Sequence, residues 1–114
     1  MDLYQDIQNL MKELTASIKL LRANGNALAA AEKDYKIKLR QEALRLRAEK
    51  DMPVTLINQV IYGVPEVAEL RFKRDVAESI YNTNMEHINV CKLKLRLLEN
   101  QLSREWGNVN NGGV

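Results

Sequence analysis

EKDMPVTLINQVIYGVP, residues 49–65, is the stretch that decides the fold of this chain. It contains both prolines of the 114-residue sequence, Pro53 and Pro65. Because the residue before a proline is pushed out of the helical region, Pro53 ends a helix that arrives from the N-terminal side. Pro65 suits the first turn of a helix that follows. The sequence therefore predicts two long helices on either side of this stretch.

A short helix is predicted within the connection, over about residues 55–62. Thr55 is a suitable N-cap residue, and Gly63 is a suitable C-terminal stop. The apolar side chains of this segment require burial; they are Leu56, Ile57, Val60 and Ile61.

The first long helix is predicted over about residues 3–50. Apolar side chains recur at intervals of three or four from Ile7 through Met11 and Ile18 to Leu46, the period of a packed helix. Asn24-Gly25-Asn26 joins three poor helix formers and is a candidate break. The stripe keeps its phase across Gly25, which favours a continuous helix over the alternative of two.

The second long helix, residues 65–106, carries two apolar stripes. The inward stripe includes Leu70, Ala77, Tyr81, Asn84, Ile88, Cys91 and Leu95, and the second includes Phe72, Val76, Ser79, Thr83, Val90, Leu93 and Leu97. A hairpin covers only one stripe, so the second requires the short helix or another copy of the chain. The short helix, about 10 Å long, reaches only the Phe72 and Val76 end. We therefore expect an interface at Phe72, Val76, Val90, Leu93 and Leu97.

The predicted fold is all-α: a long, coiled-coil-like antiparallel helical hairpin with a short connecting helix, assembled as a homo-oligomer. Residues 1–106 form one domain of a size that buries a core without disulfides. Residues 107–114 are turn formers without periodicity and are expected to be a flexible tail.

A register follows if the helices fold back so that Leu46 meets Leu70. Gly25 then lies opposite Cys91, and Glu32 lies opposite Asn84. The last pair would form a polar layer, which costs stability but fixes alignment. The alternative is that Glu32 extends to the rim and pairs with a lysine.

Composition limits the cellular compartment and the kinds of partner that we expect for this protein. The formal net charge is +2, which indicates no polyanionic partner by itself. A single cysteine excludes an internal disulfide and favours a reducing compartment. The acidic N-terminus shows no secretory signal, and no apolar run approaches the roughly 20 residues that span a bilayer. We expect a cytoplasmic protein without a membrane partner.

Catalytic and metal-binding patterns are not evident in the sequence. His87 is the only histidine, so the sequence lacks the pair of histidines, four positions apart on a helix, that would indicate a zinc site. Cys91 lies on the inward stripe, where a free cysteine behaves as a small apolar residue. The interleaved carboxylates are typical of a solvated helix face. We expect no enzyme, no metal and no cofactor.

Nucleic-acid binding is the alternative function. Residues 33–50 hold seven basic and three acidic side chains, a net charge of +4. The candidate phosphate contacts are Lys36, Arg40, Arg45 and Arg47. The basic residues spread around the helix without interleaved aromatic side chains, which favours a solvated face. The Thr55–Arg71 segment has the outline of a helix-turn-helix, but its second helix is far too long.

The stretches MPVTLI (52–57), GVPEVAELR (63–71), KRDVAE (73–78) and SREWG (103–107) resemble a family of short helical proteins encoded by phages and prophages of Gram-positive bacteria. That family has no assigned activity and no catalytic residues to carry over. Its members tend to be encoded among early genes for recombination and single-strand DNA handling. The resemblance implies an accessory protein in the bacterial cytoplasm that binds, and modulates or inhibits, an unidentified host or phage protein. The alternative is a nucleic-acid-binding accessory of phage recombination or replication.

Overall fold

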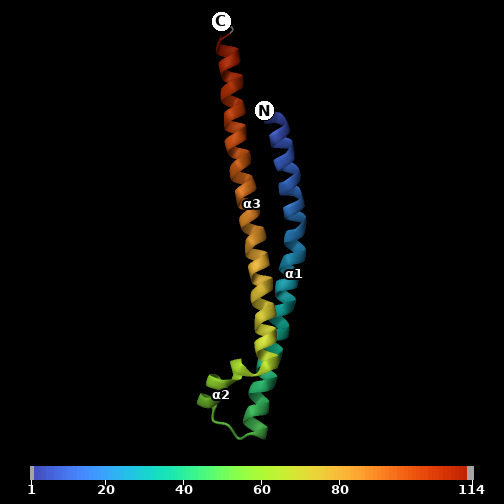
Figure 1. Ribbon diagram of the computed structural model, residues 1–114, viewed down its shortest axis with the longest axis vertical. Helices are drawn as coiled ribbons and strands as arrows, with labels where there is room; N and C mark the ends of the chain where they lie inside the picture. Colours follow the sequence, from blue (N-terminus) through green and yellow to red (C-terminus); the bar gives the residue numbers. More distant parts are fainter. Residues whose placement is uncertain (1, 113–114) are drawn as a thin grey trace. The chain divides into compact units, whose positions relative to one another are not determined.

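The computed structural model describes residues 2–112, and the side chains of residues 2–107. The described residues form α1 (Leu3–Glu49), α2 (Val54–Val60), the 3₁₀ helix η1 (Ile61–Gly63) and α3 (Pro65–Gly112) (Figure 1). The prediction of an all-α chain with two long helices and a short connecting helix is confirmed.

Helix α1 is continuous through Asn24-Gly25-Asn26, as the phase of its stripe predicts. Asp2 begins the helix, because its carboxylate accepts the backbone N–H groups of Tyr4 and Gln5 at 3.0 and 3.4 Å. A side chain at Gly25 would place its Cβ 3.4 Å from Cε2 of Tyr81. Glycine therefore costs helix propensity at this position but lets the tyrosine ring pack closely.

The connection begins where Asp51 adopts a left-handed conformation, with φ of 50°. Asp51 tolerates this conformation better than most residues do, and it lets the N–H of Met52 donate to the carbonyl of Leu46 at 3.2 Å. The prediction of Thr55 as the cap of α2 is wrong. Extended Pro53 is the N-cap residue, since its carbonyl already accepts the N–H groups of Leu56 and Ile57, each at 3.0 Å.

Helix α3 begins at Pro65, as predicted, but it continues through Gly112 rather than ending at residue 106. The predicted end of this helix at residue 106 is therefore wrong, and the flexibility expected of residues 107–114 stays a prediction. Helix propensity is a weak guide, since each Gly costs only about 1 kcal/mol relative to Ala. Gly113 and Val114 lie outside the described residues.

The chain divides into two compact units, which we name by their position. The terminal unit consists of residues 1–22 and 82–114, and the connection unit consists of residues 23–81. Within each unit α1 and α3 pack against each other in antiparallel order. The pairs are Gly25 with Tyr81 and Tyr35 with Arg74 in the connection unit, and Glu13 with His87 and Ser17 with Asn84 in the terminal unit.

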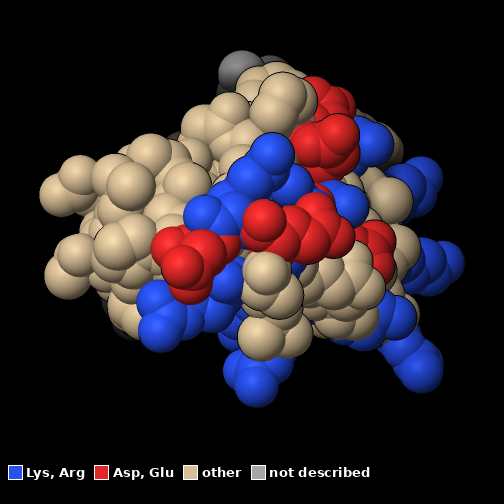
Figure 2. All heavy atoms as spheres, turned by 90° about the horizontal axis from the view of Figure 1, so that it is seen from below, with Lys and Arg blue, Asp and Glu red and all other residues tan. Residues whose placement is uncertain are grey.

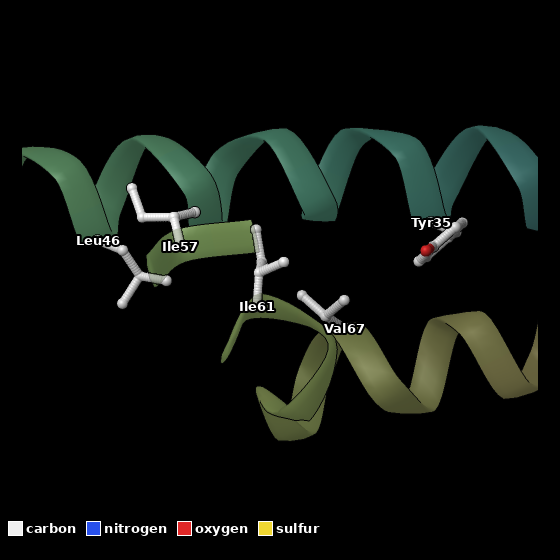
Figure 3. Packing of buried hydrophobic residues seen from close by; sticks show 5 residues of the cluster. All are labelled: Tyr35, Leu46, Ile57, Ile61 and Val67. Carbon is white, nitrogen blue, oxygen red and sulfur yellow. The ribbon is translucent and has the colours of Figure 1, made fainter. Parts of the chain in front are cut away.

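The core of the connection unit joins all of its helices. Tyr35 and Leu46 of α1, Ile57 of α2, Ile61 of η1 and Val67 of α3 form one buried cluster (Figure 3). Partly buried neighbours surround it, namely Leu39, Ala43, Met52, Val64 and Leu70. Full burial of such a side chain contributes about 1.5–3 kcal/mol, so this cluster is the main source of stability in the unit.

The predicted hairpin register is wrong, and the cluster gives the reason. Ile57 and Ile61 share the cluster with Leu46, so α2 and η1 occupy space beside the last turns of α1. The prediction had left that space to the first turns of α3. Gly25 consequently lies against Tyr81, ten residues before the predicted neighbour, Cys91.

We expect Ile61→Ala to lower the free energy of unfolding by about 2–4 kcal/mol, because it leaves a cavity where all the helices of the unit meet. The matched control is Ile37→Ala, which removes the same atoms from a half-exposed position on α1 and should cost less than about 1 kcal/mol. Urea denaturation measures both. Equal effects of the two substitutions would contradict the packing described.

Candidate functional site

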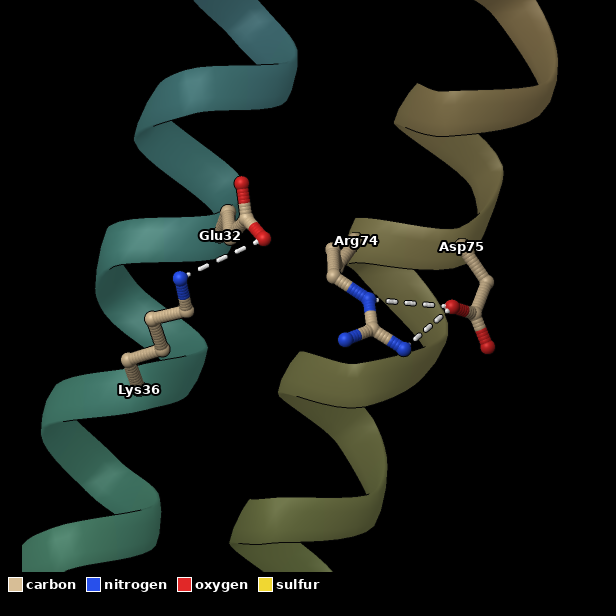
Figure 4. Close-up of polar contacts among 4 residues, drawn as sticks. All are labelled: Glu32, Lys36, Arg74 and Asp75. Atoms are coloured by element: carbon tan, nitrogen blue, oxygen red, sulfur yellow. Dashed lines mark hydrogen bonds and ion pairs between the residues drawn. The ribbon is translucent and has the colours of Figure 1, made fainter.

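A buried polar layer joins α1 and α3 in the terminal unit. The amide nitrogen of Asn84 donates to the carbonyl oxygen of Ser17 at 3.0 Å and to its hydroxyl oxygen at 2.8 Å. Both side chains are buried. The prediction of a polar layer at Asn84 is therefore right about that residue and wrong about its partner, Glu32. The carboxylate of Glu32 is half-exposed and pairs with Lys36, 3.5 Å away along α1 (Figure 4).

The polar layer also shows which face of α1 points inward in the terminal unit. Ser17 is buried, whereas Met11 and Ile18 of the predicted stripe are about half exposed. The inward position at this level of α1 is therefore Ser17, one residue before Ile18, which the apolar stripe had predicted to face inward. Apolar periodicity could not show this, because a serine marks the inward position.

Next to this layer lies a cluster that the sequence analysis missed. Nε2 of His87 is 3.1 Å from a carboxylate oxygen of Glu13 and 3.6 Å from the sulfur of Cys91. Cys91 is buried, and the other two side chains are partly exposed. His87 and Cys91 are four residues apart on α3, a spacing that the sequence did contain. Glu13 comes from α1, so only the folded chain brings it to the other two.

Several basic side chains of segment 33–50 have partners within the connection unit. The buried carboxylate of Glu42 lies 2.7 Å from Nε of Arg45 and 3.4 Å from Nζ of Lys38. Nη1 of Arg47 donates to the carbonyl oxygen of Met52 at 3.1 Å. With Lys36 paired to Glu32, three of the four predicted phosphate contacts have partners within the chain, and Arg40 is exposed.

The charge distribution on the surface agrees with these pairs. Seen from the end of the chain that carries α2, basic and acidic side chains are interleaved (Figure 2). On α3, Nη2 of Arg74 lies 2.8 Å from Asp75 (Figure 4). The guanidinium of Arg74 also stacks 4.7 Å from the ring centre of Tyr35 on α1. Such a mixed surface attracts a polyanion weakly.

The pKa of Glu42 is held below its ordinary value. The hydrogen bond from Arg45 is the main cause; burial opposes the shift, and the charges of Arg45 and Lys38 add to it. The same hydrogen bond raises the pKa of Arg45. Glu42 is therefore a structural anion that holds two cations at one side of α1.

The five residues predicted to form an interface are exposed on α3. In the connection unit, Phe72 is 63% exposed and Val76 is 41% exposed, so α2 does not cover them. In the terminal unit, Val90, Leu93 and Leu97 are exposed as expected. Phe72 and Val76 also line an apolar groove of about 230 Å³, whose other walls are Asn24, Ala27, Lys73, Ala77 and Ile80.

The helices of the described chain differ from membrane-spanning helices in composition. Within residues 2–112, none contains an apolar stretch long enough to cross a bilayer.

Substitutions at the polar layer should show how much each of its two hydrogen bonds contributes to stability. We expect Asn84→Ala to lower the free energy of unfolding by about 1–3 kcal/mol, because the buried hydroxyl of Ser17 loses its donor. Ser17→Ala should cost about 1 kcal/mol or less, since the carbonyl of residue 17 still accepts from Asn84. Thermal and urea denaturation test this order. A larger effect of Ser17→Ala than of Asn84→Ala would contradict the geometry.

Glu42 predicts a pH dependence of stability. A carboxyl group whose pKa is lower in the folded than in the unfolded state stabilises the fold at pH values above its unfolded-state pKa. This contribution is lost as the pH falls through the folded-state pKa. We expect wild type to exceed Glu42→Gln in stability near neutral pH, and the difference to shrink as the pH falls below about 4.3, the ordinary pKa of a glutamate. Urea denaturation across that range measures it. The control, Glu32→Gln, should show little difference at any pH, because its ion pair is at the surface.

Comparison of the chain with protein-family models, curated proteins and solved structures finds no match. Functional inference for this chain therefore starts from its own side chains.

Proposed function

We propose that this protein is a non-enzymatic helical interaction module that binds a second copy of itself through the outer stripe of α3. The outer stripe consists of Phe72, Val76, Val90, Leu93 and Leu97. The exposure of these five apolar side chains is the observation that carries the proposal. Two of them lie in the connection unit and three in the terminal unit, and exposed apolar groups of this kind usually mark an interface.

The balance of buried and exposed apolar side chains supports a missing partner. In the described residues, eight apolar side chains are buried and nineteen large ones are exposed. A second copy would bury some of these exposed side chains.

The spacing of the outer stripe favours an antiparallel pair. With Glu86 included, the outward positions of α3 follow intervals of four and three, the spacing of a coiled-coil seam. These positions are Phe72, Val76, Ser79, Thr83, Glu86, Val90, Leu93 and Leu97. Apolar residues lie at both ends of this seam, and polar residues lie at its centre.

An antiparallel pair can therefore set the apolar ends of the two copies against each other. Phe72 would face the second copy's Leu97, and Val76 would face its Leu93. Nearer the centre, Ser79 would face Val90, and Thr83 would face Glu86. A parallel pair would instead set Glu86 against its own copy, which like-charge repulsion disfavours. The apolar groove beside Phe72 and Val76 offers a place for an incoming leucine side chain.

The nucleic-acid alternative has less support, because Lys36, Arg45 and Arg47 already have partners within the chain. The setting of the module in a phage-infected or lysogenic bacterium, with a host or phage protein as a further partner, rests on the sequence resemblance alone. Self-association is the part of the proposal that the contacts of α3 support.

We expect the protein to elute as a dimer in size-exclusion chromatography with light scattering, and the double variant Val90→Glu, Leu93→Glu to elute as a monomer. The variant places two charges in each half of a desolvated seam, where they lack partners. The matched control is Ile37→Glu, Leu44→Glu, which charges two exposed apolar positions on α1. It should leave the dimer intact.

Two results would overturn this proposal. One is a monomeric wild type at concentrations of about 100 µM, well above the range in which specific pairs form. The other is a dimer that the double variant on α3 leaves unchanged while the control on α1 disrupts it. In that second case the interface would lie on α1. Circular dichroism of each variant establishes that it keeps its helical fold.

A further inference from the structure

We infer that Glu13, His87 and Cys91 form a binding site for a divalent transition-metal ion of the zinc class. The three side chains bring one oxygen, one nitrogen and one sulfur atom to within 4.8 Å of one another. The site lies wholly in the terminal unit, where α1 supplies the carboxylate and α3 supplies the other two groups. It is independent of the proposed self-association.

Two of the three separations between ligand atoms match a tetrahedral ion. With bonds of about 2.3 Å to sulfur and about 2.0 Å to nitrogen or oxygen, neighbouring ligands are about 3.5 Å apart for sulfur and nitrogen, and about 3.3 Å apart for nitrogen and oxygen. The corresponding distances here are 3.6 Å from Cys91 to His87 and 3.1 Å from His87 to Glu13. The third separation, from Cys91 to Glu13, is within 4.8 Å, and the exposed side chain of Glu13 would close it by shifting.

Hydrogen bonding accounts well for only one of the two contacts of this imidazole nitrogen. A protonated Nε2 of His87 donates to the carboxylate of Glu13 at 3.1 Å, and the sulfur of Cys91, 3.6 Å away, is then a weak second acceptor. An ion bound between the three groups would instead use a lone pair of each.

The donor set selects the class of ion. Thiolate and imidazole suit zinc and its neighbours among the transition metals, whereas calcium and magnesium require oxygen ligands. Cys91 is buried, but the side chains of His87 and Glu13 are about half exposed, so an ion can reach the site from solvent. On binding, the thiol proton and any proton on the imidazole leave to solvent. Three protein ligands leave a fourth position for water or an external ligand.

The test uses the reduced, full-length protein freed of metal, with Co²⁺ as the spectroscopic probe and Zn²⁺ as its competitor. We expect a thiolate-to-cobalt charge-transfer band, visible bands typical of tetrahedral cobalt, and loss of both on addition of Zn²⁺. Glu13→Gln, His87→Gln and Cys91→Ser should each weaken Co²⁺ binding by at least about tenfold, the loss that even outer-shell substitutions cause.

The matched control is Glu99→Gln, which removes an exposed carboxylate from α3 in the same unit and should change affinity by less than about twofold. Absence of the charge-transfer band would overturn the inference. So would binding that Glu13→Gln and His87→Gln leave within about twofold of wild type, because the thiol alone would then be the ligand. These two positions are partly exposed, so their variants decide the question even if Cys91→Ser fails to fold.

Discussion

The contact of α2 and η1 with the last turns of α1 governs the packing of the connection unit. Ile57 and Ile61 bury their side chains against Leu46, and Val67 completes the cluster from the start of α3. This contact determines where α3 first meets α1 and so sets the hairpin register. Tyr81 is brought to the level of Gly25 as a result, where a Cβ on residue 25 would just touch its ring.

A hairpin of two helices buries little apolar surface, and this limitation shapes the rest of the molecule. Each helix can turn only one face toward the other, so apolar residues on any second face remain exposed. Helix α3 carries such a face along much of its length, from Phe72 to Leu97. The proposed association with a second copy would cover these residues.

Polar groups in the narrow core make contacts that apolar side chains could not make. Asn84 bonds to both the carbonyl and the hydroxyl of Ser17, which fixes the alignment of α1 with α3 in the terminal unit. One turn away on α3, the imidazole of His87 meets a carboxylate and a thiol. In the connection unit, Glu42 binds Arg45 and Lys38, and this pairing removes the basic segment as a strong anion-binding surface.

The sequence by itself determined the helices, because their signals are local. Pro53 and Pro65 mark the ends of the connection, and the three-four spacing of apolar residues marks both long helices and the two stripes of α3. The tertiary structure decided the register, the partner of Asn84 and the meeting of Glu13 with His87 and Cys91. These depend on how much of α1 the connection covers, and that length is set by side-chain packing between segments distant in sequence. A repeat of three or four residues fits several registers almost equally well, so spacing alone could not choose among them.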